Sequence, residues 1–120
     1  MRLFKRGAAN GEEGSSSEKS MDQERERKDD EGIRRHFIVS GRVQGVGFRY
    51  TAFQVANTYG LTGWVCNCYD GTVEMEVQGP EEMVNTFLKR MKLMNKWMRV
   101  EHVEESDRPV INESGFSERY

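Results

Sequence analysis

The sequence predicts an α+β fold with the element order β-α-β-β-α-β, in which two helices cover one face of an antiparallel sheet. Two observations carry this prediction. Apolar residues repeat with a helical period in two segments, each of which follows a short stretch typical of a strand. Between the two helical segments, an Asp-Gly pair separates two further strand-like stretches, which is the pattern of a hairpin.

The first strand and the first helix are predicted at residues 35–40 and 48–59. The strand segment, RHFIVS, is rich in β-branched and aromatic residues and ends at Gly41, which indicates a strand followed by a loop. In the helical segment the apolar residues follow a 3.6-residue period, and this period stops at Gly60, a residue type that commonly ends helices.

The hairpin is predicted from residue 62 to residue 78. Residues 62–67 are its first strand, Asp70 and Gly71 its turn, and residues 72–78 its second strand. The second strand alternates apolar with polar side chains, so one of its faces is expected in the core and the other toward water. The apolar set is Val73, Met75 and Val77.

The second helix is predicted to begin at Gly79-Pro80-Glu81-Glu82, where a proline needs no hydrogen-bond donor and two carboxylates favour the helix dipole. Residues 97–106 are the last full strand, and residues 116–120 are a candidate for a short edge strand. With both helices on one face, this is a ferredoxin-like split βαβ sandwich. The buried stripe of the second helix is expected to be Val84, Phe87, Leu88, Met91 and Met94.

The composition changes near residue 32, and we expect an ordered domain at residues 33–120 preceded by a disordered charged tail at residues 1–32. In the tail, 16 of the 32 residues are charged, so it lacks the apolar surface that would offset the entropy of ordering it. The domain balances 11 positive with 11 negative side chains, and the whole chain carries a formal charge of -2. This balance predicts neither a nucleic-acid partner nor a membrane partner.

Export signals and metal motifs are weak in this sequence. No apolar run approaches the about 20 residues of a membrane span, and no signal-peptide core is evident, so we expect a cytoplasmic protein. Cys66 and Cys68 lie two residues apart on a predicted strand, where a disulfide would be strained, so both thiols are expected to be reduced. A lone C-x-C is weak evidence for a zinc site, so we expect no bound metal. We also expect no cofactor and a monomeric protein.

The loop between the first strand and the first helix has the composition of an oxyanion site. It reads GRVQGVG over residues 41–47, and its glycines allow positive φ angles that turn backbone N–H groups toward one point. The helix that follows adds its positive end. The loop matches neither nucleotide motif, because no Lys-Ser/Thr pair follows and Tyr50 stands where a third glycine would be. These features favour phosphate over nucleotide binding.

Arg49 and Asn67 are the candidate catalytic residues. Arg49 lies in the first turn of the predicted helix, where its charge opposes the dipole unless an anion is bound, and its planar fork matches two phosphate oxygens. The alternative is that its stem packs along the sheet. Asn67 ends the second strand, on the same rim as the loop, where its carboxamide could hold a water molecule. The alternative is an Asx-turn.

Four segments of this chain form a longer pattern: GRVQGVGFR at residues 41–49, GWVCNCYDGTVE at 63–74, VQGPEE at 77–82 and FSERY at 116–120. Together they closely resemble the acylphosphatase family. The resemblance implies metal-free hydrolysis of an acyl phosphate to a carboxylate and inorganic phosphate, with Arg49 binding the phosphate and Asn67 orienting the attacking water. The residues expected to hold the phosphate are Val43, Gln44, Gly45, Val46, Gly47, Phe48 and Arg49.

Two other functions remain open at this point. A binding module with the same loop would sense phosphate or acyl phosphate without turnover, but it would need no residue to position water. An RNA-binding domain of this fold would need exposed aromatic residues on its central strands, and Phe37 is a weak candidate for one.

Several other polar residues are expected outside the reaction. His36 and His102 lie in predicted strands without a nucleophile motif, so we expect structural roles for both. Glu74 and Glu76 are expected on a solvated face rather than as an acid/base pair. The carboxylate of Tyr120 could pair with Arg49 or with a neighbouring cation if the last strand lay beside the first.

Overall fold

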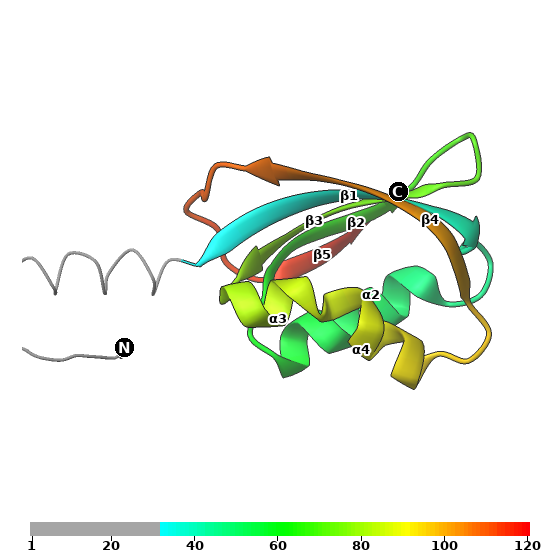
Figure 1. The fold of residues 1–120 in the computed structure, drawn as a ribbon, viewed down its shortest axis with the longest axis horizontal. Helices are drawn as coiled ribbons and strands as arrows, with labels where there is room; N and C mark the ends of the chain where they lie inside the picture. Colours follow the sequence, from blue (N-terminus) through cyan, green and yellow to red (C-terminus); the bar gives the residue numbers. More distant parts are fainter. Residues whose placement is uncertain (1–31) are drawn as a thin grey trace, which may run out of the picture. The chain divides into compact units, whose positions relative to one another are not determined.

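The computed structural model describes residues 32–120, which form a five-stranded sheet covered on one face by helices α2, α3 and α4 (Figure 1). The expected tail at residues 1–32 lies outside the described residues except for Gly32. The strands follow the order β4-β1-β3-β2-β5 across the sheet. The elements are β1 (Ile33–Arg42), α2 (Phe48–Thr58), β2 (Thr62–Asn67), β3 (Val73–Gly79), α3 (Glu81–Asn85), α4 (Phe87–Met94), β4 (Arg99–Arg108) and β5 (Phe116–Arg119).

The first four strands confirm the predicted β-α-β-β-α-β arrangement. Strand β1 pairs antiparallel with both β3 and β4, and β2 pairs antiparallel with β3. Strands β1 and β2 therefore run in the same direction and end at the same rim, although β3 lies between them. This rim carries the loop that leads into α2 (Figure 1).

The expectation of an entirely antiparallel sheet is wrong at one edge, because β5 pairs parallel with β2. Strand β4 runs antiparallel to β1, so it ends at the rim where β1 and β2 begin. The connection at residues 109–115 leads from there to the free edge of β2, and a strand that starts at this rim must run in the direction of β2. The candidate edge strand at residues 116–120 is thus present, but it lies beside the second strand and not the first.

The hydrophobic core fills the space between the sheet and the helices. Strand β3 follows the predicted alternation: Val73, Met75 and Val77 are fully buried, while the intervening polar residues are on the opposite face. Val73 lies opposite Val39 of β1 on one side and opposite Asn67 of β2 on the other. The register therefore places Asn67 at the helix-covered side of the sheet, at the end of the core.

The second helix is divided where the sequence predicted a continuous one. Helix α3 ends before Thr86, whose hydroxyl donates to the carbonyl oxygen of Glu82, and α4 begins after it. The predicted stripe is buried at Val84, Phe87 and Met91, and Leu88 is partly buried. Met94, also expected in that stripe, is 52% exposed, because α4 ends at this residue.

Candidate functional site

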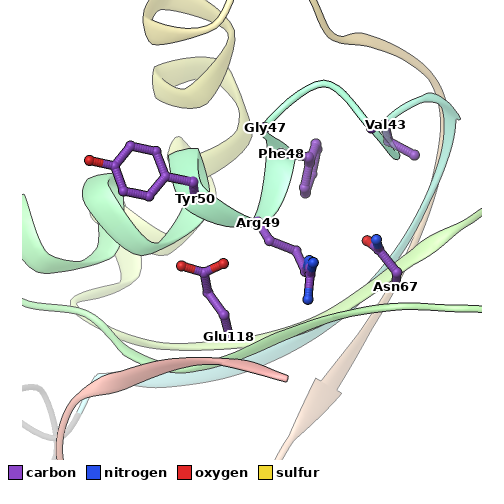
Figure 2. Close-up of a pocket in the computed structure, with 8 residues that line it drawn as sticks. Val43, Gly47, Phe48, Arg49, Tyr50, Asn67 and Glu118 are labelled. Atoms are coloured by element: carbon purple, nitrogen blue, oxygen red, sulfur yellow. The ribbon is translucent and has the colours of Figure 1, made fainter. Parts of the chain in front are cut away.

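A pocket of about 180 Å³ lies at the rim where β1 and β2 end (Figure 2). The loop before α2, the first turn of α2, the end of β2 and strand β5 all contribute to it. Arg49 and Asn67, the two candidate catalytic residues, are 18 positions apart in the sequence and both line this pocket. The complete lining is Val43, Gly45, Gly47, Phe48, Arg49, Tyr50, Asn67 and Glu118.

The loop has buried ends and an exposed glycine backbone. Val43 and Phe48 are each 1% exposed, so both ends are anchored in the core. Between them, Gly45 and Gly47 have φ angles of 74° and 80°, a backbone conformation that is unfavourable for residues other than glycine. Gly47 is the N-cap of α2, and no side chain caps this helix. The first N–H groups of α2, at the pocket rim, therefore have no side-chain acceptor.

Two side-chain carboxamides hold this loop in place. The Gln44 Nε2 group donates to the carbonyl oxygens of Cys68 at 2.7 Å and of Thr72 at 2.8 Å, which ties the loop to the turn that follows Asn67. From the other side, Asn95 Nδ2 donates to the carbonyl oxygen of Val46 at 3.0 Å. Gln44 and Val46 were expected in the phosphate site, but neither lines the pocket. The side chain of Gln44 fixes the spacing between the loop and the end of β2, and a part for the loop N–H groups of Gln44 and Val46 in phosphate binding stays a prediction.

Asn95 was missed by the sequence analysis. It is 8% exposed, and besides Val46 it contacts the Thr51 hydroxyl at 3.0 Å and accepts from the backbone N–H of Trp97 at 2.9 Å. An asparagine after a helix is a common local pattern, so nothing in the sequence distinguished this buried tether from an ordinary turn residue.

Asn67 lines the pocket from the end of β2. It has the same strand parity as the buried Val65, so its side chain is on the helix side of the sheet, as Figure 2 shows. Within residues 32–120 its carboxamide makes no hydrogen bond, and the Asx-turn of this hairpin belongs to Asp70, which accepts from the Thr72 N–H at 3.0 Å. Asn67 therefore does not form the Asx-turn that was its alternative role.

Arg49 is held by the C-terminal segment. Its Nη1 atom donates to the carbonyl oxygen of Arg119 at 2.9 Å, and its Cζ atom lies 4.1 Å from the centroid of the Tyr120 ring. The two contacted groups, a main-chain carbonyl and an aromatic ring, carry no formal charge, and within residues 32–120 Arg49 forms no ion pair, so these contacts orient the guanidinium without neutralising it. A pairing of the Tyr120 carboxylate with Arg49 was expected only if the last strand lay beside the first. Strand β5 lies beside β2 and not β1, so this condition is not met.

Tyr50 and Glu118 also line the pocket and were missed by the sequence analysis. Tyr50 is 58% exposed, on the first turn of α2. Glu118 is half-buried and pairs in register with Val65, so it extends from β5 on the same side of the sheet as Asn67. The spacing of Glu118 and the apolar Phe116, two residues apart, indicates that both side chains lie on the same face of a strand. The sequence does not indicate which strand β5 pairs with.

A second polar cluster lies on the open face of the sheet, away from the pocket. Arg34, which is 3% exposed, donates to Glu76 at 2.6 Å, Gln78 at 3.0 Å and Glu113 at 2.7 Å. Burial would raise the pKa of Glu113, but hydrogen bonding and nearby positive charge, with the Arg34 hydrogen bond the largest of these effects, hold this pKa below its ordinary value. Glu76 is thus part of an ion-pair cluster and not simply solvated, as the sequence analysis expected.

His36 belongs to the same open face. Its Nε2 atom lies 2.7 Å from a carboxylate oxygen of Glu74, and its ring contacts Trp64 edge-on. Phe37, the candidate aromatic for an RNA platform, is 3% exposed and belongs to the core, so it offers no stacking surface. Within residues 32–120, no three His, Cys, Asp or Glu residues gather closely enough to hold a metal ion.

None of the helices in the described part of the chain has both the length and the apolar character needed to cross a membrane.

The known proteins that this chain is similar to include acylphosphatases. The family model described as Acylphosphatase matches residues 35–118. An acylphosphatase of Bifidobacterium longum is 43% identical over 82 residues, which are 68% of this chain and 84% of that protein. One of Clostridium acetobutylicum is 47% identical over 79 residues, or 65% of this chain and 87% of that protein. The crystal structure of acylphosphatase from Bacillus subtilis has a TM-score of 0.68 and 36% identity, covering 73% of this chain and 99% of that one.

Proposed function

The chain belongs to the acylphosphatase family, and we propose that it hydrolyses small-molecule acyl phosphates in the pocket lined by Arg49 and Asn67. The observation that carries this proposal is the meeting, in one pocket, of an arginine, a carboxamide and two loop glycines that come from separate elements. The products are a carboxylate and inorganic phosphate.

In this proposal the phosphoryl group binds between the loop and Arg49. The N–H groups around Gly45 and Gly47 and the positive end of α2 face the phosphoryl oxygens. The Arg49 guanidinium supplies formal positive charge and two parallel donors. Its hydrogen bond to the Arg119 carbonyl keeps it in this orientation before substrate arrives, so little ordering is needed on binding.

Asn67 positions the attacking water. Its side-chain oxygen accepts a hydrogen bond from the water, whose oxygen then lies in line with the bond from phosphorus to the acyl oxygen. As the water oxygen bonds to phosphorus, the bond to the bridging oxygen breaks and the carboxylate leaves with the electron pair. The water proton moves to a phosphoryl oxygen, which gives dihydrogen phosphate.

A site without a strong general base fits this reaction. The leaving carboxylate is a stable anion, so correct placement of the water and stabilisation of charge on the phosphoryl oxygens supply most of the rate enhancement. In this mechanism the stabilising positive charge comes from Arg49 and the backbone of the loop rather than from a metal ion.

Hydrolysis of benzoyl phosphate in the presence of EDTA, followed by its ultraviolet absorbance, tests the proposal. We expect rapid turnover by the unaltered protein. Arg49→Ala should lower kcat/KM by about 10³-fold and Asn67→Ala by about 10²-fold, because each removes a group aimed at the transition state. Circular dichroism should show that both variants remain folded.

Two matched variants control for the loss of an arginine or an asparagine elsewhere. Arg99→Ala and Asn57→Ala remove exposed side chains of the same types that do not line the pocket, and we expect both to keep the activity of the unaltered protein. If the unaltered protein binds phosphate but does not hydrolyse benzoyl phosphate, the enzyme proposal fails and a phosphate-sensing role takes its place.

The expected setting of the enzyme is part of the same proposal. We infer a monomeric cytoplasmic enzyme that does not act on nucleic acid. Free thiols at Cys66 and Cys68 fit a reducing compartment, and the neutral charge balance of residues 33–120 argues against a polyanionic partner.

A further inference from the structure

We propose that Glu118 selects substrates by the charge of their acyl group: it favours acyl phosphates whose acyl part is cationic and disfavours those with a second negative charge. This inference rests on the proposed function. Its starting point is that a carboxylate, half-buried on β5, lines a pocket that otherwise has the properties of an anion site.

The geometry of the reaction places the acyl group near Glu118. In Figure 2, Asn67 and Glu118 lie on opposite sides of the Arg49 side chain. In a displacement at phosphorus the attacking and leaving oxygens are roughly in line. If Asn67 holds the water and Arg49 the phosphoryl group, the leaving carboxylate and its acyl group point to the side of Glu118.

The strand register supports this placement. Glu118 is paired with Val65, two positions before Asn67 on β2, and both side chains are on the helix side of the sheet. Two positions along a strand and one strand across separate the two Cα atoms by roughly 8 Å, which leaves room for a phosphoryl group between the side chains.

Glu118 is also firmly positioned. Strand β5 is fixed by its pairing with β2, and Phe116, two residues earlier, is 6% exposed and lies against Phe87 with ring centroids 6.4 Å apart. Tyr50 also lines the pocket, and in Figure 2 it lies on the same side of Arg49 as Glu118. Within residues 32–120, Glu118 forms no ion pair, so its negative charge acts on whatever occupies the pocket.

The test uses three acyl phosphates of nearly the same shape: benzoyl phosphate, 4-(aminomethyl)benzoyl phosphate and 4-carboxybenzoyl phosphate. Each kcat/KM is divided by the uncatalysed hydrolysis rate of the same compound, which removes differences in intrinsic reactivity. For the unaltered enzyme we expect the cationic compound to be preferred over the anionic one by about tenfold, the scale of a charge interaction near a protein surface. Added salt should reduce this preference.

Substitution of Glu118 then separates selection from catalysis. In Glu118→Gln the preference should fall below about threefold, and in Glu118→Lys it should reverse in favour of the anionic compound. Because the preference is a ratio measured within one protein, a loss of folded protein cancels out of it. Glu104→Gln, which removes an exposed carboxylate from β4 at the other edge and on the open face, should keep the original preference.

The possible failures are distinct. Absence of benzoyl phosphate turnover by the unaltered enzyme overturns the proposed function, and this inference with it. If all three compounds are turned over without a charge preference, the role of Glu118 is overturned and the proposed function stays intact. The same holds if Glu118→Gln and Glu118→Lys keep the charge preference of the unaltered enzyme.

Discussion

Arg34 and Arg49 have opposite environments on the two faces of one sheet. Arg34, on the open face, is 3% exposed and donates hydrogen bonds to the carboxylates of Glu76 and Glu113, so its positive charge is balanced within the protein. Arg49, on the helix-covered face, is partly exposed in a pocket, where the contacts in the described residues are a main-chain carbonyl and the Tyr120 ring. These contacts orient the Arg49 guanidinium but leave its positive charge in place.

The contrast teaches how one side-chain type serves stability in one place and binding in another. An arginine that is enclosed by carboxylates cannot hold an anion without losing those partners. An arginine positioned by neutral groups retains its charge and is ready for a phosphoryl group. The two regions are also connected, because Glu113 belongs to the segment that leads into β5, and the carbonyl that orients Arg49 lies at the end of that strand.

The largest expected effect on stability comes from Arg34→Ala. Removal of this side chain leaves the half-buried Glu113 without its ion-pair partner and Glu76 with only the longer contact to Arg108 at 3.7 Å, so the free energy of unfolding should fall by about 3 kcal/mol. Turnover by the folded fraction should stay within about threefold, because Arg34 is on the face opposite the pocket. Urea unfolding and benzoyl phosphate hydrolysis measure the two quantities.

Arg35→Ala is the matched control for this comparison. Arg35 is the next residue on β1, and its partners Glu105 and Asp107 are 51% and 88% exposed, so its loss should cost less than about 1 kcal/mol. Equal losses of stability from the two substitutions would show that the buried cluster is no more important than a surface pair.

A smaller effect is expected from Glu113→Gln, and it should depend on pH. Burial opposes ionisation of Glu113, but Arg34 holds its folded-state pKa below the ordinary value of 4.5. A lowered pKa stabilises the folded state above pH 4.5, and this contribution is lost as the pH falls through the folded-state pKa. At pH 7 the variant should be about 1 kcal/mol less stable than the unaltered protein.

Urea titrations at a series of pH values from 7 downward test this prediction. The difference in the free energy of unfolding between the two proteins should shrink below pH 4.5. A difference that stays constant, or grows, as the pH falls would contradict the assigned ion pair.

The smallest expected effect comes from deletion of residues 1–32. All residues that line the pocket and all residues of the Arg34 cluster lie after residue 32, so benzoyl phosphate turnover should stay within about twofold of the full chain. The same deletion should leave the urea midpoint unchanged. A large loss of either would show that this segment contributes to the domain that we propose for residues 33–120.

Local features of the fold were predictable because they depend on short patterns. Strand β2 occupies the predicted residues 62–67, and α2 begins at the predicted Phe48. The break at Thr86 was not predictable, because the apolar period continues across it. The edge on which β5 pairs was also hidden, since it depends on where β4 ends and on how residues 109–115 return to the sheet.

The candidate site divides in the same way. The loop glycines and the arginine at the helix start are adjacent in the sequence, so their combination was visible there as an oxyanion motif. Asn67 was assigned by its place at a strand end and by family resemblance, whereas Glu118, Tyr50 and the Asn95 tether emerged only from the folded chain.

By itself, the sequence determined the approximate positions of β1–β4 and α2, the glycine positions of the loop and the position of Arg49 in the first turn of α2, because each depends on neighbouring residues. The tertiary structure decided which arginine has its charge matched and which keeps it for a ligand. It also decided that a carboxylate from β5 enters the pocket. These outcomes depend on strand order and register, which result from many weak contacts between distant segments and leave no local pattern in the chain.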